Sequence, residues 1–180
     1  MAAWLVAIAL FVAPWASAAD PPAETALAAS VKAAYLCKFL NYIELPASAA
    51  PQDDAPFVIG VAGSDEVFAA LQQMVKGRNV KNRPLIARYI GETDPLIGVH
   101  VLFVSRQIDI AQSTLVKDAR DASVVVVSET PAGLVQGSII NFLLLSGRVR
   151  FEVNLDAAEA ASIKISSRIL AVAERVVGAR

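Results

Sequence analysis

The sequence contains very few of the side chains that bind metals, form disulfides or carry out nucleophilic catalysis. Cys37 is the only cysteine and His100 the only histidine among its 180 residues. One cysteine cannot form an intrachain disulfide, and a zinc site needs about four ligands of this kind. A serine nucleophile usually needs a base nearby. We therefore expect no metal, no cofactor and no enzymatic activity, and we interpret Cys37 and His100 as packing residues.

Neither sign of charge predominates, and the basic residues form no run. The chain has 16 Lys and Arg against 17 Asp and Glu, which gives a formal net charge of −1. Proteins that bind nucleic acids usually present a basic face to the phosphates, so we expect no nucleic-acid partner. A hydrophobic fraction of 56% also argues against a disordered chain. The length is sufficient for one domain with a substantial core.

Residues 1–19 contain no charged side chain. An apolar stretch from Trp4 to Val12 is followed by a proline and a run of small residues. This pattern is typical of a secretory signal peptide, and the apolar stretch is too short to span a bilayer core of about 30 Å. We predict an exported protein that is cleaved after Ala18 or Ala19 and forms one domain over residues 20–180. An uncleaved membrane anchor is the alternative.

Short apolar runs alternate with amphipathic segments through the first two thirds of the mature chain. The amphipathic segments predict helices over Glu24–Ile43, from the capping residue Ser64 to Lys76-Gly77, and over Ile108–Arg120. The apolar runs predict buried strands over Phe57–Ala62, Pro84–Ile90, Val99–Val104 and Val124–Val127. Strands that alternate with helices are typical of a mostly parallel sheet covered by helices.

The last third of the chain has a different pattern. Two strand-like runs, Ile139–Leu145 and Val149–Leu155, flank Ser146-Gly147 and predict a β-hairpin. Asp156 is positioned to cap a short helix, and Ser166 and Ser167 to cap a final helix that ends near Val177. We therefore predict a single-domain α/β sandwich: a mixed, mostly parallel sheet covered by helices, with a C-terminal β-hairpin followed by helices.

The predicted hairpin has two unlike faces. A two-residue turn pairs Leu145 with Arg148 and Asn141 with Glu152, and side chains alternate along each strand. One face is apolar, with Phe142 and Phe151, and belongs to a core. The other face carries Asn141, Arg148, Arg150, Glu152 and Asn154 among leucine and isoleucine. This face is either a surface for a ligand or partner, or a solvated face with an Arg150–Glu152 ion pair, and the pattern does not decide between them.

Polar residues follow two of the predicted strands. Ser128-Glu129-Thr130 comes after the valine strand, and Ser105-Arg106 after the strand before it. In open α/β sheets, ligands tend to bind beyond the carboxyl ends of the strands. These residues therefore indicate a small-ligand crevice, although helix capping and turn formation explain them as well and are the favoured interpretation. A hydrolase that uses Ser128 and Glu129 is a third, weaker hypothesis.

Four segments carry a resemblance to a known family. They are KAAYLCKFLNYIELP (32–46), FVIGVAGSDEVFAAL (57–71), VLFVS (101–105) and GSIINFLLLSGRVRFEVNLDAAEAASIKISSRILAVA (137–173). Together they resemble the YfiR-like periplasmic proteins over nearly the whole mature chain, and the last segment is the most specific. The resemblance implies a compact α/β sandwich that is often a dimer.

The resemblance also implies a function. YfiR-like proteins are periplasmic inhibitors of membrane-bound diguanylate cyclases: they bind the sensor domain that the cyclase presents outside the inner membrane and hold the enzyme inactive. Loss of the inhibitor raises cyclic di-GMP, exopolysaccharide and biofilm. The implied partner here is such a sensor domain, with a second copy of the chain or an unidentified small ligand as further partners. The competing hypothesis is a periplasmic small-molecule binding module without a cyclase partner.

The candidate contact residues come from the hairpin and from the segment after it, where the resemblance is densest. They are Asn141, Arg150, Glu152 and Asn154, with Ser166, Ser167 and Arg168 expected nearby. We predict that together they form a surface that binds the partner or a ligand.

Overall fold

A computed structural model describes residues 21–178 of the chain. The predicted signal peptide and its cleavage site lie outside the described residues. The helices are α1 (Pro21–Phe39), α2 (Asp65–Val75), α3 (Thr114–Asp121), α4 (Leu155–Ala160) and α5 (Ser167–Leu170). The strands are β1 (Ile43–Glu44), β2 (Phe57–Ala62), β3 (Asn79–Val80), β4 (Arg83–Tyr89), β5 (Val101–Val104), β6 (Val125–Ser128), β7 (Ile140–Leu145), β8 (Arg148–Asn154), β9 (Lys164–Ile165) and β10 (Arg175–Val177).

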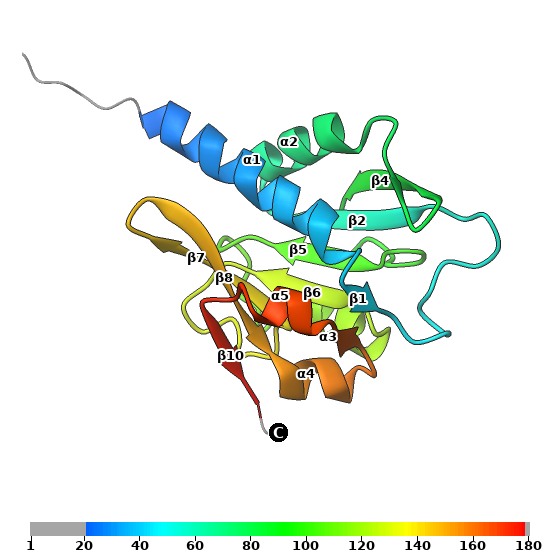
Figure 1. Ribbon diagram of the computed structural model, residues 1–180. Coiled ribbons are helices and arrows are strands. Elements are labelled where there is room, and N and C mark those ends of the chain that lie inside the picture. Colours follow the sequence, from blue (N-terminus) through cyan, green and yellow to red (C-terminus); the bar gives the residue numbers. More distant parts are fainter. Residues whose placement is uncertain (1–20, 179–180) are drawn as a thin grey trace, which may run out of the picture.

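Eight of these strands form one sheet in the order β10-β8-β7-β6-β5-β2-β4-β3 (Figure 1). The β3–β4 and β7–β8 pairs are antiparallel, and the other neighbours in the sheet are parallel. A separate antiparallel pair is formed by β1 and β9. The predicted α/β class with a mixed, mostly parallel sheet is confirmed.

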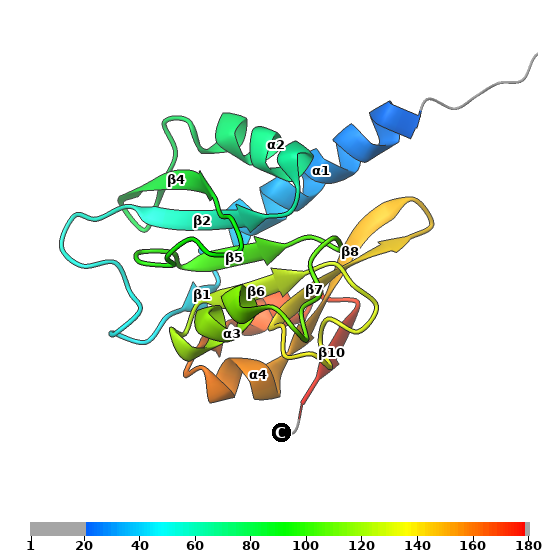
Figure 2. The same ribbon diagram turned by 180° about the vertical axis from the view of Figure 1, so that it is seen from behind.

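Helices cover both faces of the sheet, so its central strands are buried on both sides. Along β2, Phe57, Ile59 and Val61 belong to the core beneath α1 and α2, whereas Val58 and Ala62 belong to the core beneath α3. Figure 1 shows α1 crossing one face, and α3 lies in front of the opposite face in Figure 2. This double burial explains why the central strands are almost wholly apolar.

Two predicted helices are shorter than expected at one end. The first helix ends at Phe39 rather than at Ile43, which lies in β1 and pairs with Ile165. The third helix begins at Thr114, because Ser113 caps it by accepting a hydrogen bond from the Val116 N–H at 3.3 Å. The residues before it, from Ile108 onward, form turns, and two isoleucines of these turns are still buried. The spacing of these isoleucines in the sequence resembles that of apolar residues on a helix.

The C-terminal segment differs most from the prediction. Asn154, not Asp156, caps α4, since its side chain accepts from the Ala157 N–H at 3.0 Å. Ser166 does cap a helix, but that helix ends at Leu170, and the chain then forms β10 in parallel with β8. The final helix predicted to Val177 is therefore wrong. Pairing with β10 satisfies backbone groups along β8 that would lie at an open sheet edge if the last segment were a helix.

The predicted hairpin register is confirmed. Leu145 lies opposite Arg148 and Asn141 lies opposite Glu152. Ser146 and Gly147 have φ angles of 50° and 72°, the left-handed pair that a two-residue type I′ turn requires. The hairpin tip projects beyond the neighbouring strands (Figure 1).

Candidate functional site

A cleft of about 800 Å³ lies at the carboxyl ends of β2, β5 and β6, and we call it the strand-end cleft. Its lining comprises Thr25, Ala28, Ala29 and Lys32 of α1, Gly63, Ser64, Glu66 and Val67 at the start of α2, Ser105–Gln107, Glu129–Pro131, and Phe142, Leu143, Leu144 and Val149 of the hairpin. The crevice indicated by the polar residues after the strands is therefore present, with one charged wall and one apolar wall.

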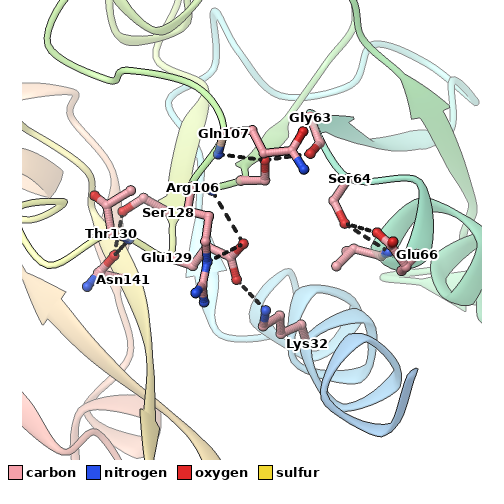
Figure 3. Close-up of polar contacts among 12 residues, drawn as sticks. Lys32, Gly63, Ser64, Glu66, Arg106, Gln107, Ser128, Glu129, Thr130 and Asn141 are labelled. Carbon is pink, nitrogen blue, oxygen red and sulfur yellow. Dashed lines mark hydrogen bonds and ion pairs between the residues drawn. The ribbon is translucent and has the colours of Figure 1, made fainter. Parts of the chain in front are cut away.

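The turn after β2 shapes one side of this cleft. Gly63 has φ +74°, and a Cβ there would lie 2.6 Å from the Ser105 Oγ, so a side chain would not fit. The Ser105 hydroxyl donates to the Gly63 carbonyl at 2.6 Å and accepts from the Gln107 N–H at 3.2 Å. These bonds tie the β2 and β5 loops together (Figure 3). Ser64 caps α2 by accepting from the Val67 N–H.

Glu129 provides the buried charge of the cleft. Its side chain is 8% exposed and forms an ion pair with Lys32 of α1. Its other carboxylate oxygen lies 3.8 Å from the Arg106 Nε and accepts weakly from the Arg106 N–H at 3.4 Å (Figure 3). Because the Arg106 side chain is 68% exposed, its guanidinium keeps donors available to a bound group. The cleft is therefore suited to binding through an apolar wall and an accessible cation.

A line of polar side chains runs laterally through the sheet beside the cleft. Ser128 lies opposite Asn141, Asn141 opposite Glu152, and Glu152 opposite Arg175, so β6, β7, β8 and β10 each contribute one residue. We call these four residues the polar row.

The members of the polar row are joined by hydrogen bonds. The Ser128 hydroxyl donates to Asn141 Oδ1 at 2.7 Å, and the Asn141 amide donates to Glu152 Oε1 at 3.0 Å. The Arg175 guanidinium donates to Glu152 Oε2 from Nε at 2.9 Å and from Nη2 at 2.5 Å. The Thr130 N–H also donates to Asn141 Oδ1 at 3.1 Å, which connects the row to the wall of the cleft.

The structure corrects the predicted accessibility of two hairpin residues. Asn141 is 0% exposed and Glu152 is 3% exposed, so the part of the polar face around these two residues is a buried network, where a binding surface or a solvated face was expected. Glu152 pairs with Arg175 and not with Arg150. Asn154 caps α4 and donates to the Leu134 carbonyl at 3.0 Å. Of the four hairpin residues, only Arg150 is exposed.

The remaining candidate residues lie elsewhere. Ser166, Ser167 and Arg168 line a second pocket with residues of β1, β9 and the β3–β4 turn, and the lining of that pocket includes none of the hairpin residues. The predicted site is thus divided among a buried row, an exposed arginine and a separate pocket. A role for any of them in binding a partner stays a prediction.

The residues that sequence reasoning missed come from distant segments. Lys32 and Glu129 are 97 positions apart, and Arg175 falls within the helix that the sequence predicts for the last segment. The rule about strand ends did indicate Ser105, Arg106 and Glu129. No comparable signal exists for Lys32, which follows the amphipathic pattern of its helix.

The single cysteine, Cys37, and the single histidine, His100, are both buried. Cys37 is buried in the core under α1, and this burial raises the pKa of its thiol. His100 is 4% exposed, and its Nδ1 accepts a hydrogen bond from the Val58 N–H at 3.0 Å. Burial is the main cause that lowers the pKa of His100 below its ordinary value. Both observations agree with the packing roles predicted for them.

Among the residues that the structure describes, Ser128 has no catalytic partner within reach. Its side chain is fully buried and donates to Asn141, while the Glu129 carboxylate binds Lys32 and Arg106. Within residues 21–178, no three His, Cys, Asp or Glu side chains gather in a way that would hold a metal ion. None of the helices in this part of the chain is long and apolar enough to cross a membrane.

These features define the class, an α/β domain with a cleft at its strand ends. The YfiR/HmsC-like family model matches residues 29–174, and the chain belongs to this family. The family is periplasmic and regulatory, and it acts through protein partners. No curated protein matches the chain.

One solved structure supports the fold. The crystal structure of a conserved domain protein from Vibrio cholerae superimposes with a TM-score of 0.51 at 14% sequence identity. The similarity covers 83% of this chain and 60% of that one. At this identity the comparison supports a shared fold and carries no conclusion about function.

Proposed function

We propose that this protein is a periplasmic repressor that binds the sensor domain of an inner-membrane diguanylate cyclase and limits cyclic di-GMP and biofilm formation. The observation that carries the proposal is the match to the YfiR/HmsC-like family over residues 29–174. The protein reaches the periplasm by means of its N-terminal segment, which is removed after Ala18 or Ala19. The intact mass of material from the periplasm tests this step, and a full-length mass in the membrane fraction would contradict it.

The exposed end of the hairpin is the contact surface that we assign to the sensor domain. Leu144 and Leu145 are 55% and 41% exposed, and Arg150 is exposed on the adjoining strand. Leu145 lies on the same face of the hairpin as Arg150, whereas Leu144 lies on the opposite face. An apolar side chain presented together with an arginine is characteristic of the centres of protein interfaces. Leu144 also lines the strand-end cleft, so a partner segment held there would extend over the cleft. Asn141 and Glu152 act indirectly, because they fix the hairpin from within.

Deletion of the gene tests the proposal in cells. Cyclic di-GMP should rise on deletion and return to its original level when the wild-type protein is supplied. An Arg150→Glu protein with an unchanged melting temperature should fail to restore repression. The matched control is Lys117→Glu, which reverses an exposed charge on α3, outside the hairpin. A deletion that leaves cyclic di-GMP unchanged would refute the proposal, and full repression by Arg150→Glu would refute the assigned surface.

The strand-end cleft supports a second candidate function, a small-molecule binding module. Its volume of about 800 Å³ falls within the range of about 300–1,000 Å³ that ligand pockets occupy. An apolar wall with a few convergent charges is the usual composition of such pockets. Native mass spectrometry of protein purified from the periplasm would reveal a retained ligand. Arg106→Gln should release that ligand, whereas Lys117→Gln should not. A ligand that both variants retain would place its site outside the cleft.

A further inference from the structure

A second pocket, of about 480 Å³, lies at the end of the molecule opposite the strand-end cleft. It is lined by the β1–β9 pair, by Lys81 of the β3–β4 turn, and by the residues that begin α5. Lys81 precedes β4, which runs parallel to β2, so this pocket adjoins the amino ends of strands whose carboxyl ends form the cleft. In Figure 1, β1 and α5 lie side by side across this region. We call it the basic pocket.

The basic pocket has an excess of positive charge. Lys81, Lys164 and Arg168 line it, and Glu44 is its single carboxylate. The three cations come from two segments, the β3–β4 turn and residues 164–168, although the whole chain has a net charge of −1. The ion pairs of the described residues involve Lys32, Arg106, Lys117 and Arg175 as cations. The cations of the basic pocket thus have no carboxylate partner among residues 21–178, although Glu44 lies opposite Lys164 in the β1–β9 pair.

The backbone holds one of these cations over the pocket. Lys81 and Asn82 have φ angles of 50° and 65°, a conformation that residues other than glycine adopt infrequently. The Lys81 ammonium donates to the Ile43 carbonyl at 2.8 Å. This bond fixes the side chain in place and leaves the other N–H groups of the ammonium available as donors.

Hydroxyl groups complete the donor set. The Ser166 N–H donates to the Tyr42 carbonyl at 2.9 Å, and the Ser166 Oγ accepts from the Arg168 N–H at 3.3 Å. The Ser166 hydroxyl can therefore still donate its own hydrogen to a bound group. Ser167 is exposed and lines the same pocket. Ammonium, guanidinium and hydroxyl donors around one space form the usual surroundings of a phosphate group.

We propose that the basic pocket binds the phosphate group of a small phosphorylated molecule. Three cations match a ligand that carries two or more negative charges better than they match a single carboxylate. The pocket volume leaves room for a polar body attached to the phosphate. This site is independent of the proposed repression of a cyclase, and either assignment can hold without the other.

Calorimetric titration of the full mature protein with inorganic pyrophosphate tests the proposal. The wild-type protein should bind with a Kd below about 1 mM. Lys164→Gln and Arg168→Gln should each weaken binding about three- to tenfold, because each removes one partly exposed charge contact. Matched controls are Lys117→Gln and Arg148→Gln, which remove the same charges from exposed positions on α3 and on the hairpin tip. Both controls should bind within about twofold of the wild type.

The outcomes distinguish a specific phosphate site from a general attraction of anions to surface charge. Absence of binding up to about 10 mM pyrophosphate, or equal losses in the controls, would overturn the proposal. Binding only to vesicles that contain phosphatidylglycerol, and not to pyrophosphate, would reassign the pocket to a membrane surface and also overturn it. Arg168→Glu serves as a second variant if a lysine variant unfolds: binding should disappear while the melting temperature stays unchanged.

Discussion

Where the β7–β8 hairpin lies within the sheet, both of its faces are buried, but by different physical means. On one face, Phe142 and Phe151 pack against Tyr35 and Phe39 of α1, with ring centroids 5.2 to 6.0 Å apart. On the other face lies the polar row. The aromatic face is stabilised by close packing of the rings and by the apolar surface that they remove from water. The polar face is stable only because each buried group has a partner. The comparison shows that an alternating pattern identifies the residues of a face without revealing what covers it.

The loop after β6 covers the polar face. A Cβ on Gly133 would lie 2.2 Å from the Ser128 Oγ and 2.5 Å from Asn141 Oδ1, so the loop backbone passes directly over the row. Glycine is the one residue that permits this approach. A hairpin with a solvated polar face would need no such glycine. Substitutions on the aromatic face, in the polar row and at Gly133 therefore test whether the two faces are buried as described.

The largest loss of stability is expected for a substitution on the aromatic face. Phe151→Ala should lower the free energy of unfolding by about 3–5 kcal/mol, because it leaves a cavity among the rings that contact α1. Chemical denaturation measures this change. Phe151→Leu is the matched control and should lose less, since it retains most of the apolar volume. A loss below about 1 kcal/mol for Phe151→Ala would mean that the cluster contributes little to stability.

The polar row should show an intermediate effect. Glu152→Ala should lower the free energy of unfolding by about 2 kcal/mol, because it leaves the buried Asn141 amide without an acceptor. A solvated Glu152 would lose well under 1 kcal/mol on the same change. Glu152→Gln should fall between Glu152→Ala and the wild type, since its carbonyl can still accept from Asn141. Equal stability of all three proteins would contradict the buried network.

Gly133→Ala tests whether the loop after β6 lies against the polar row, and it leaves the four residues of the row unchanged. The added methyl would overlap the Ser128 hydroxyl and the Asn141 carbonyl oxygen, and the loop must move away to accept it. We expect a loss of about 1–3 kcal/mol, the usual cost of overpacking. A double variant with Ser128→Ala should recover part of this loss. Complete independence of the two changes would show that the loop and the row are not in contact.

A smaller effect should depend on pH. Burial lowers the pKa of His100 below its ordinary value of 6.5, so near and below pH 6.5 the unfolded chain binds a proton that the folded chain does not. The contribution of His100 to stability is therefore full above about pH 6.5. It falls as the pH is lowered towards the folded pKa. Denaturation curves at several pH values measure the effect, and His100→Gln should remove this component. A stability that rises on acidification through this range would contradict it.

The smallest change in stability is expected for Arg150→Ala. Arg150 lies between Val149 and Phe151 but faces solvent, and the residues that the structure describes offer it no ion pair. Its removal should alter the free energy of unfolding by less than about 0.5 kcal/mol, as measured by chemical denaturation. A larger loss would place Arg150 in the polar row and weaken the contrast between exposed and buried polar residues of one strand.

The parts of the molecule that could be predicted are those that depend on neighbours in the sequence. The hairpin register follows from alternation and from Ser146-Gly147, and the cap at Ser64 follows from its position after an apolar run. The polar row could not be predicted, because the parallel pairing of Ser128 with Asn141 and of Glu152 with Arg175 joins separate segments. In the last segment, the spacing of Val172 and Val176 imitated a helix, and pairing with β8 prevailed.

Part of the strand-end cleft could also be predicted from the sequence. Ser105 and Glu129 follow predicted strands, so the general geometry of parallel sheets brings them to one edge. The cation that balances Glu129 is contributed by α1, across 97 positions of sequence. A helix pattern identifies the face that packs against the sheet, but it does not identify the strand end against which each side chain will lie.

The polar row also determines when the fold can be completed as the chain arrives in the periplasm. Glu152 precedes Arg175, the cation that balances it, by 23 positions in the sequence. Until β10 has formed, the sheet would have to bury a carboxylate without its cation, a state that is strongly unfavourable. The final segment of the chain therefore completes the sheet, and a chain that ends before Arg175 should stay loosely folded and open to proteases.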